Sequence, residues 1–87
     1  PGPWALLAWR VGVDALARLG AAREQAWELD VVLRAPREVR YACMLDGLLA
    51  ATGASPGKLG LRLEPVASEA ELQALVTHRP TGRTLTY

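Results

Sequence analysis

Two residues of this 87-residue chain are the clearest candidates for ligand binding or catalysis, and both lie on one predicted helix. Cys43 and Asp46 stand three positions apart, with Gly47 and Ala50 at spacings of four and seven from the cysteine. Because residues three and four apart are neighbours on a helix, these residues share one small, polar face. A thiolate is both a nucleophile and a metal ligand, so Cys43 is a candidate site residue. The alternative is a free cysteine that packs as a small apolar side chain.

Asp46 is the candidate carboxylate of this face. It could bind a ligand or act as a base, or it could pair structurally with Arg10 or with a backbone amide. No second carboxylate stands at a spacing that defines an acid–base pair, so the sequence assigns no catalytic residue.

His78 is the only histidine, and it falls at the end of a predicted strand beside a turn. A structural zinc site takes four protein ligands, and a catalytic one takes three plus water. With one cysteine and one histidine, only carboxylates or a second chain could complete a metal site. We therefore expect His78 to be an exposed residue at a strand end.

Gly57-Lys58 suggests phosphate binding, but the surrounding pattern differs from a P-loop. Thr52 stands where that motif has its first glycine, and Leu59 follows the lysine in place of Ser or Thr. The predicted order is also helix, loop, strand, whereas a P-loop runs from strand to helix. A glycine-rich turn with Lys58 could still hold an anion through backbone amides. The alternative is a helix stop followed by a strand start.

The elements that must position these residues alternate between helical and extended patterns. Apolar residues recur at three- and four-residue spacing over 4–19 and again over 39–52, and a glycine follows each segment, which predicts two helices. Gly12, inside the first helix, suggests that another element packs close to it. Residues 27–34 and the alternating leucines around 59–64 predict two strands.

The C-terminal third is harder to assign. Ser68 to Glu71 resembles a capping box that could begin a helix, whereas Leu72, Ala74 and Val76 alternate as in a strand reaching His78. We favour the strand, because Pro80-Thr81-Gly82 then forms a turn into a β-rich tail over 83–87. The predicted fold is α+β, with two helices on a mostly antiparallel sheet of about four strands, in the order α-β-α-β-β-β.

Composition narrows the class of protein further. Eighty-seven residues form a single domain over 1–87, and 51% of them are hydrophobic, which is a high share for so short a chain. We expect a homodimer that hides part of this surface, with an apolar monomer as the alternative. A net charge of +1 argues against nucleic-acid and membrane-surface binding. The single cysteine suits a reducing cytoplasm, and no apolar run reaches the ~20 residues of a membrane span.

The second helix and the turn after it resemble the FmdE family of formylmethanofuran dehydrogenase proteins. That family has a cysteine, two apolar residues and Asp-Gly, then Thr-Gly, a small or hydroxyl pair and Gly-Lys. The opening Gly2-Pro3-Trp4, the stretch Trp9-Arg10-Val11-Gly12 and the turn Thr81-Gly82-Arg83 are also similar to family patterns. The matching positions of the second helix and its turn are Cys43, Asp46, Gly47, Thr52, Gly53, Ser55, Gly57 and Lys58.

The resemblance implies an α+β fold, dimerisation and a cleft in which the cysteine helps to hold a metal. Only Pro1 stands where the family has its upstream histidines, and Leu49 and Gly60 replace the family's Gln and Asn. The resemblance is thus to a minimal or degenerate member.

The function that we expect is an accessory small-ligand or metal-associated homodimer of redox or one-carbon metabolism, not a complete enzyme by itself. The resemblance gives Cys43, Asp46, Lys58 and Arg10 as the ligand-binding set, Cys43 as the metal ligand and zinc as the candidate ion. For Arg10, an ordinary surface arginine is the alternative. The rival hypothesis is a non-enzymatic dimeric interaction module that has lost the family's metal site. A third hypothesis is a thiol enzyme that uses Cys43.

Overall fold

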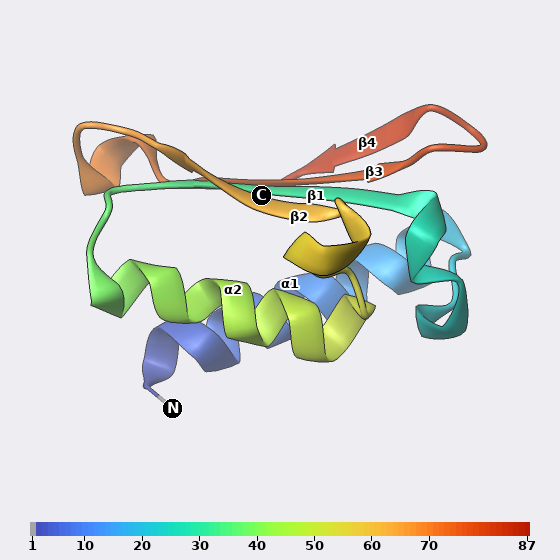
Figure 1. The fold of residues 1–87 in the computed structure, drawn as a ribbon, viewed down its shortest axis with the longest axis horizontal. Helices are drawn as coiled ribbons and strands as arrows, with labels where there is room; N and C mark the ends of the chain where they lie inside the picture. The colour runs from blue at the N-terminus through green and yellow to red at the C-terminus, as the bar shows by residue number, and fades with distance from the viewer. Residues whose placement is uncertain (1) are drawn as a thin grey trace.

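Two helices lie side by side beneath one face of a four-stranded sheet in the computed structural model, which describes residues 2–87 (Figure 1). The helices are α1 (Pro3–Leu19) and α2 (Val39–Thr52). The strands are β1 (Leu29–Ala35), β2 (Leu61–Pro65), β3 (Gln73–His78) and β4 (Arg83–Thr86). The predicted α+β class and the order α-β-α-β-β-β are confirmed.

The sheet is mixed, in the spatial order β2-β1-β3-β4. β1 and β2 are parallel because α2 and its flanking loops cross between them, as parallel neighbours require. β3 runs antiparallel to both β1 and β4, and the short turn before Arg83 closes the β3–β4 hairpin. The prediction of a mostly antiparallel sheet therefore holds for two of its three strand pairs.

Short 3₁₀ turns replace parts of the predicted strands. Trp27 belongs to η1 (Arg23–Glu28), and β1 starts only at Leu29. Leu59 follows η2 (Pro56–Lys58) in a left-handed conformation, and β2 starts at Leu61. In residues 68–78, both the capping box and the alternating strand pattern correspond to structure. The capping box of Ser68 begins η3 (Glu69–Glu71), and the favoured strand follows it as β3.

The core lies between the sheet and the helices. One face of β1 is fully apolar, and it meets the inner face of α2 and the buried residues of β2 and β3. The opposite face of the sheet is polar: Arg62 pairs with Asp30 at 3.2 Å and with Glu64 at 3.3 Å. The largest fully buried side chains of the core are Tyr41, Leu29, Leu33, Leu48, Val31, Val76 and Thr52.

Helix α1 packs through its small residues. Its buried positions are Ala5, Ala8, Gly12, Ala15 and Leu19, so the side that meets the rest of the fold is nearly smooth. A Cβ built on Gly12 would lie 2.6 Å from the Cβ of Ala51, which confirms that another element packs close there. A Cβ on Gly47 of α2 would lie 2.2 Å from the carbonyl oxygen of Ala5. The two helix backbones therefore approach closely, and the bulky residues of α1 are left to other sides of the helix.

Candidate interaction site on the helix layer

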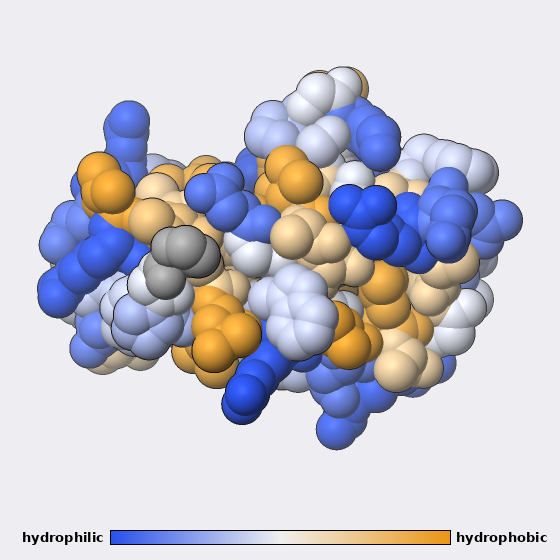
Figure 2. Space-filling model, turned by 90° about the horizontal axis from the view of Figure 1, so that it is seen from below, coloured by the Kyte–Doolittle hydropathy of each residue, from blue (hydrophilic) through white to orange (hydrophobic). Residues whose placement is uncertain are grey.

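The outer side of the helix layer, facing away from the sheet, holds an open hollow of about 410 Å³. It runs between the first half of α1 and the second half of α2, where the small residues of both helices leave a furrow. Figure 2 shows several hydrophobic residues spread over this side, with hydrophilic ones between and around them. The walls of the hollow are formed by Gly2, Ala5, Leu6, Trp9, Asp46, Gly47 and Ala50.

Bulky apolar side chains of both helices are exposed, and two of them, Leu6 and Trp9, line the hollow. Leu6, Trp9 and Val13 of α1 are 54%, 45% and 44% exposed, and Leu49 of α2 is 37% exposed. The spacing of the first three, three and four residues apart, sets them in one stripe along α1. We call these four residues with Ala50 the outer apolar face. A contiguous apolar surface rimmed by polar groups is typical of a binding site.

Two opposite charges flank the outer apolar face. Asp46 is the single ionisable side chain in the walls of the 410 Å³ hollow. Arg10 lies on the other side of Leu6, in the wall of a smaller hollow of about 190 Å³ with Pro3 and Leu7. Neither takes part in an ion pair within residues 2–87, and the predicted structural pairing of Asp46 with Arg10 is not formed within one chain.

The structure separates the other two predicted site residues from this hollow. Cys43 is half-buried one turn before Asp46 on α2, so its thiol is not sealed in the core, but it does not line the hollow. Lys58 lies beyond the C-terminal end of α2, where its ammonium donates a hydrogen bond to the carbonyl oxygen of Gly53 at 3.3 Å. The Gly57-Lys58 turn thus closes the helix, and the hydroxyl of Ser55 accepts from the Lys58 amide at 3.2 Å.

The donors that a metal would need are scattered. Within residues 2–87, no three His, Cys, Asp or Glu side chains are close enough together to hold an ion. His78 is only 12% exposed in its side chain, less than expected for a strand-end histidine, and its Nε2 lies 3.6 Å from Glu28. Its Nδ1 shares a hydrogen bond of 3.0 Å with Thr81. The residues of one chain therefore do not fit a zinc site that includes Cys43 and His78.

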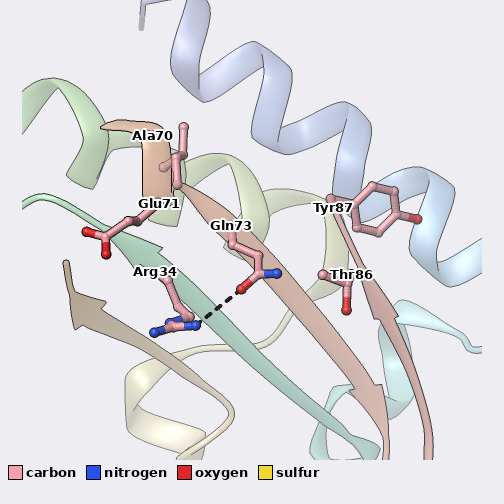
Figure 3. A pocket seen from close by; sticks show the side chains of 7 residues that line it. Arg34, Ala70, Glu71, Gln73, Thr86 and Tyr87 are labelled. Carbon is pink, nitrogen blue, oxygen red and sulfur yellow. Dashed lines mark hydrogen bonds between the residues drawn. The ribbon is translucent and has the colours of Figure 1, made fainter. Parts of the chain in front are cut away.

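A second hollow, of about 370 Å³, opens beside the ends of β3 and β4 (Figure 3). It is polar, and its one cationic group, Arg34, donates to the side-chain oxygen of Gln73 at 3.3 Å and lies 3.7 Å from Glu64. The other charged group of the wall, the carboxylate of Glu71, accepts from the backbone amides of Ala67 at 2.9 Å and Ser68 at 3.3 Å. Both charged groups of this hollow therefore already have partners. It was not predicted from the sequence, since its walls meet only when β1, β3 and β4 align.

One coupled pair of titrating groups lies on the opposite side of α1, away from the hollow. The hydroxyl of Tyr87 donates a hydrogen bond to the carboxylate of Asp14, which also pairs with Arg18 at 2.9 Å. Burial and this hydrogen bond raise the pKa of Tyr87 to about 12. The same bond, assisted by Arg18, holds the pKa of Asp14 below its ordinary value. The pair ties the end of β4 to α1.

The sequence pattern of the helices did not predict that Leu6, Trp9, Val13 and Leu49 would be exposed. The signal that could have found them is the small-residue pattern Ala5, Ala8, Gly12 and Ala15, which occupies the packing side of α1. A helix that buries its small residues must present its large ones elsewhere.

The fold and this surface define a small two-layer α+β domain with exposed apolar side chains on its helices. The family model FmdE, described as "Molybdenum formylmethanofuran dehydrogenase operon", matches residues 1–87, and the chain belongs to this family. Neither a curated protein nor a solved structure matches the chain significantly. Among the described residues, no helix has the length and apolar character needed to cross a bilayer.

Proposed function

We propose that this FmdE-family domain works as a homodimer in which the outer apolar faces of two copies meet. The observation that carries the proposal is the exposure of Leu6, Trp9, Val13 and Leu49 on one side of a domain of only 87 residues. So small a domain buries only about 60% of its unfolded surface, so its stability is marginal. Exposure of a large apolar surface to water is then unfavourable. Association of two copies would remove this surface from water.

We propose an accessory, binding role for the dimer and not a complete enzyme, in the redox or one-carbon setting that the family suggests. General acid–base catalysis needs groups placed on both sides of a reacting bond. The hollow offers one carboxylate, Asp46, in otherwise apolar and small-residue walls. Such walls suit the exclusion of water from a docked apolar group more than they suit proton transfer.

Metal or small-ligand binding is proposed only for the assembled dimer, because one chain lacks a complete set of donors within residues 2–87. Two copies would supply two Cys43 thiols, each half-buried one turn from the hollow. The reducing cytoplasm that a lone cysteine suits would keep these thiols available as ligands.

Sedimentation velocity of surface variants tests the dimer. Leu6→Glu and Val13→Glu place a carboxylate on the outer apolar face, and each should convert the dimer to a monomer while circular dichroism stays unchanged. The matched control is Leu59→Glu, because Leu59 is 83% exposed but lies after η2, away from the helix face. Equal dissociation by all three variants, or by none, would contradict the proposed interface.

Metal analysis of untagged protein tests the proposed metal binding by the dimer. We expect zinc to copurify with the dimer and to be lost in Cys43→Ser. Metal-free protein in both cases would leave the dimeric interaction module, without a metal, as the function.

A further inference from the structure

We propose that Arg10 of each copy enters the hollow of the other copy and pairs there with Asp46. This inference rests on the proposed homodimer and names the contact that sets its register. Pairing of Asp46 with Arg10 inside one chain is not what the structure shows, yet both side chains lie beside the outer apolar face. Pairing between copies gives each of these charges a partner.

The hollow has the chemistry that receives a guanidinium on an apolar stem. Its volume of about 410 Å³ is lined by Ala5, Leu6, Gly47 and Ala50, which suit the methylene groups of an arginine. Trp9 presents an indole, the aromatic ring that attracts cations best. Asp46 supplies the one negative charge, and a guanidinium can bind a carboxylate through two parallel hydrogen bonds.

Symmetry makes the pairing self-consistent. In a two-fold dimer one patch meets itself, so if Arg10 of the first copy contacts Asp46 of the second, the reverse contact forms as well. Arg10 stands on α1, and Asp46 stands on α2 across the furrow. Gly47 lies against the backbone of Ala5 and Trp9, so Asp46 and Arg10 are also near each other in height along the two helices. A two-fold axis along the furrow would set α1 of each copy over α2 of the other.

The pair gives a role to the acid and the base that line the two hollows beside the apolar face. Apolar contact alone leaves the rotation and sliding of two helix layers weakly defined. Opposite charges at fixed positions favour the one register in which they pair, because other registers bring like charges together. Such pairs contribute more to the specificity of an interface than to its affinity. Arg10 and Asp46 are thus positioning residues for the dimer.

A charge-swap experiment tests the inference. Arg10→Asp leaves two acidic groups at the contact, and Asp46→Arg leaves two basic groups, so each variant alone should self-associate roughly 100-fold more weakly than the parent chain. Mixed in equal amounts, the two variants should form a heterodimer with an affinity within about tenfold of the parent, because both contacts between the copies then join an acid to a base. Analytical ultracentrifugation with a fluorescent label on one variant measures this directly.

The neutral variants Arg10→Gln and Asp46→Asn remove one charge each without reversing it, so they keep the test valid if the charge-reversed variants do not fold. Each should weaken the dimer, and the double variant should be no weaker than the worse single variant, as expected of two groups that act as one contact. Unchanged self-association in all single variants, or no heterodimer on mixing, would overturn the pairing while leaving the dimer itself intact. A monomeric parent chain would overturn the proposed function as well.

Discussion

At the scale of single residues, Gly47 sets the distance between the two helices. A Cβ at this position would lie 2.2 Å from the carbonyl oxygen of Ala5 and 2.9 Å from the amide nitrogen of Trp9. Both are backbone atoms, so no side-chain rotation relieves the clash and the helices would have to separate. The hollow and the outer apolar face depend on this close approach.

We therefore expect Gly47→Ala to lower the free energy of unfolding by about 3 kcal/mol, as overpacking of a tight contact does. Chemical denaturation followed by circular dichroism measures the change. The control is Gly57→Ala, where an added Cβ would meet only the Ser55 hydroxyl at 4.0 Å, and the change should stay within about 1 kcal/mol. Equal stability of the two variants would contradict the tight helix packing.

The Tyr87–Asp14 pair predicts a stability change at high pH. Tyr87 has an ordinary pKa of 10.0, raised in the fold to about 12. Since the fold disfavours the phenolate, the stabilisation is complete below pH 10 and is lost as the pH rises toward 12. Carbon chemical shifts of the Tyr87 ring should titrate near 12 in the parent chain and at a lower pH in Asp14→Asn. A midpoint at the ordinary value in the parent would show that the contact is absent in solution.

Residue-level chemistry was only partly predictable from the sequence. Gly12 signalled a close neighbour correctly because a helix-interior glycine is costly and implies a steric reason. The ligand-binding set of Cys43, Asp46, Lys58 and Arg10 stays a prediction, and the structure brings only Asp46 and Arg10 to the outer apolar face. Lys58 lies elsewhere because η2 turns its side chain back onto the Gly53 carbonyl, a local bond that no spacing rule reveals.

At the scale of elements, α1 has two stripes of apolar residues, and the sequence pattern did not show which of them is buried. The large apolar residues Leu6, Trp9 and Val13 recur at helical spacing, and so do the small residues Ala5, Ala8 and Gly12. Periodicity identifies both stripes but does not say which one packs inside the domain. The choice falls to the small residues because they let α2 approach, and only the partner helix, distant in sequence, decides this.

Strand starts were predicted too early for a related reason. Trp27 and Leu59 have the residue types of strands, but they lie in the turns that precede β1 and β2. The guanidinium of Arg79 donates to the carbonyl oxygens of both residues, at 3.1 and 3.2 Å. This bridge between two turns joins segments far apart in sequence, so local pattern could not predict it.

Leu59 yields an element-scale prediction, because it adopts φ 57° although it is not glycine. A left-handed conformation costs an ordinary residue about 1 kcal/mol, and this exposed leucine offsets little of that by packing. Leu59→Gly should therefore raise the free energy of unfolding by up to about 1 kcal/mol. The same exchange within a helix, Leu7→Gly, should lower it by about 1 kcal/mol or more. Thermal melts of the two variants against the parent test the contrast, and destabilisation by both would contradict it.

At the scale of the whole molecule, the two broad surfaces differ in kind. The open face of the sheet carries cross-strand ion pairs such as Arg62 with Asp30. Such a polar face is stable in contact with water and needs no partner to cover it. The helix layer instead presents the outer apolar face and two charges without ion-pair partners in the described chain. The composition predicted excess apolar surface, and six of the nine exposed bulky apolar residues of the described chain belong to α1 and α2.

The proposed dimerisation of this face would make stability depend on protein concentration. Because association binds only folded chains, mass action should raise the melting temperature as the protein is concentrated. The variant Leu6→Glu should melt at one temperature over the same range. A parent chain whose melting temperature does not change with concentration would argue against a dimer within that range.

An isotope-filtered nuclear Overhauser experiment on an equal mixture of labelled and unlabelled chains tests the proposed dimer most directly, because it detects only contacts between copies. A dimer joined through the outer apolar faces should give cross-peaks from Leu6, Trp9 and Val13 of one copy to Leu49 and Ala50 of the other. Intermolecular cross-peaks from the open face of the sheet, or none from the helix layer at concentrations where a dimer sediments, would contradict it.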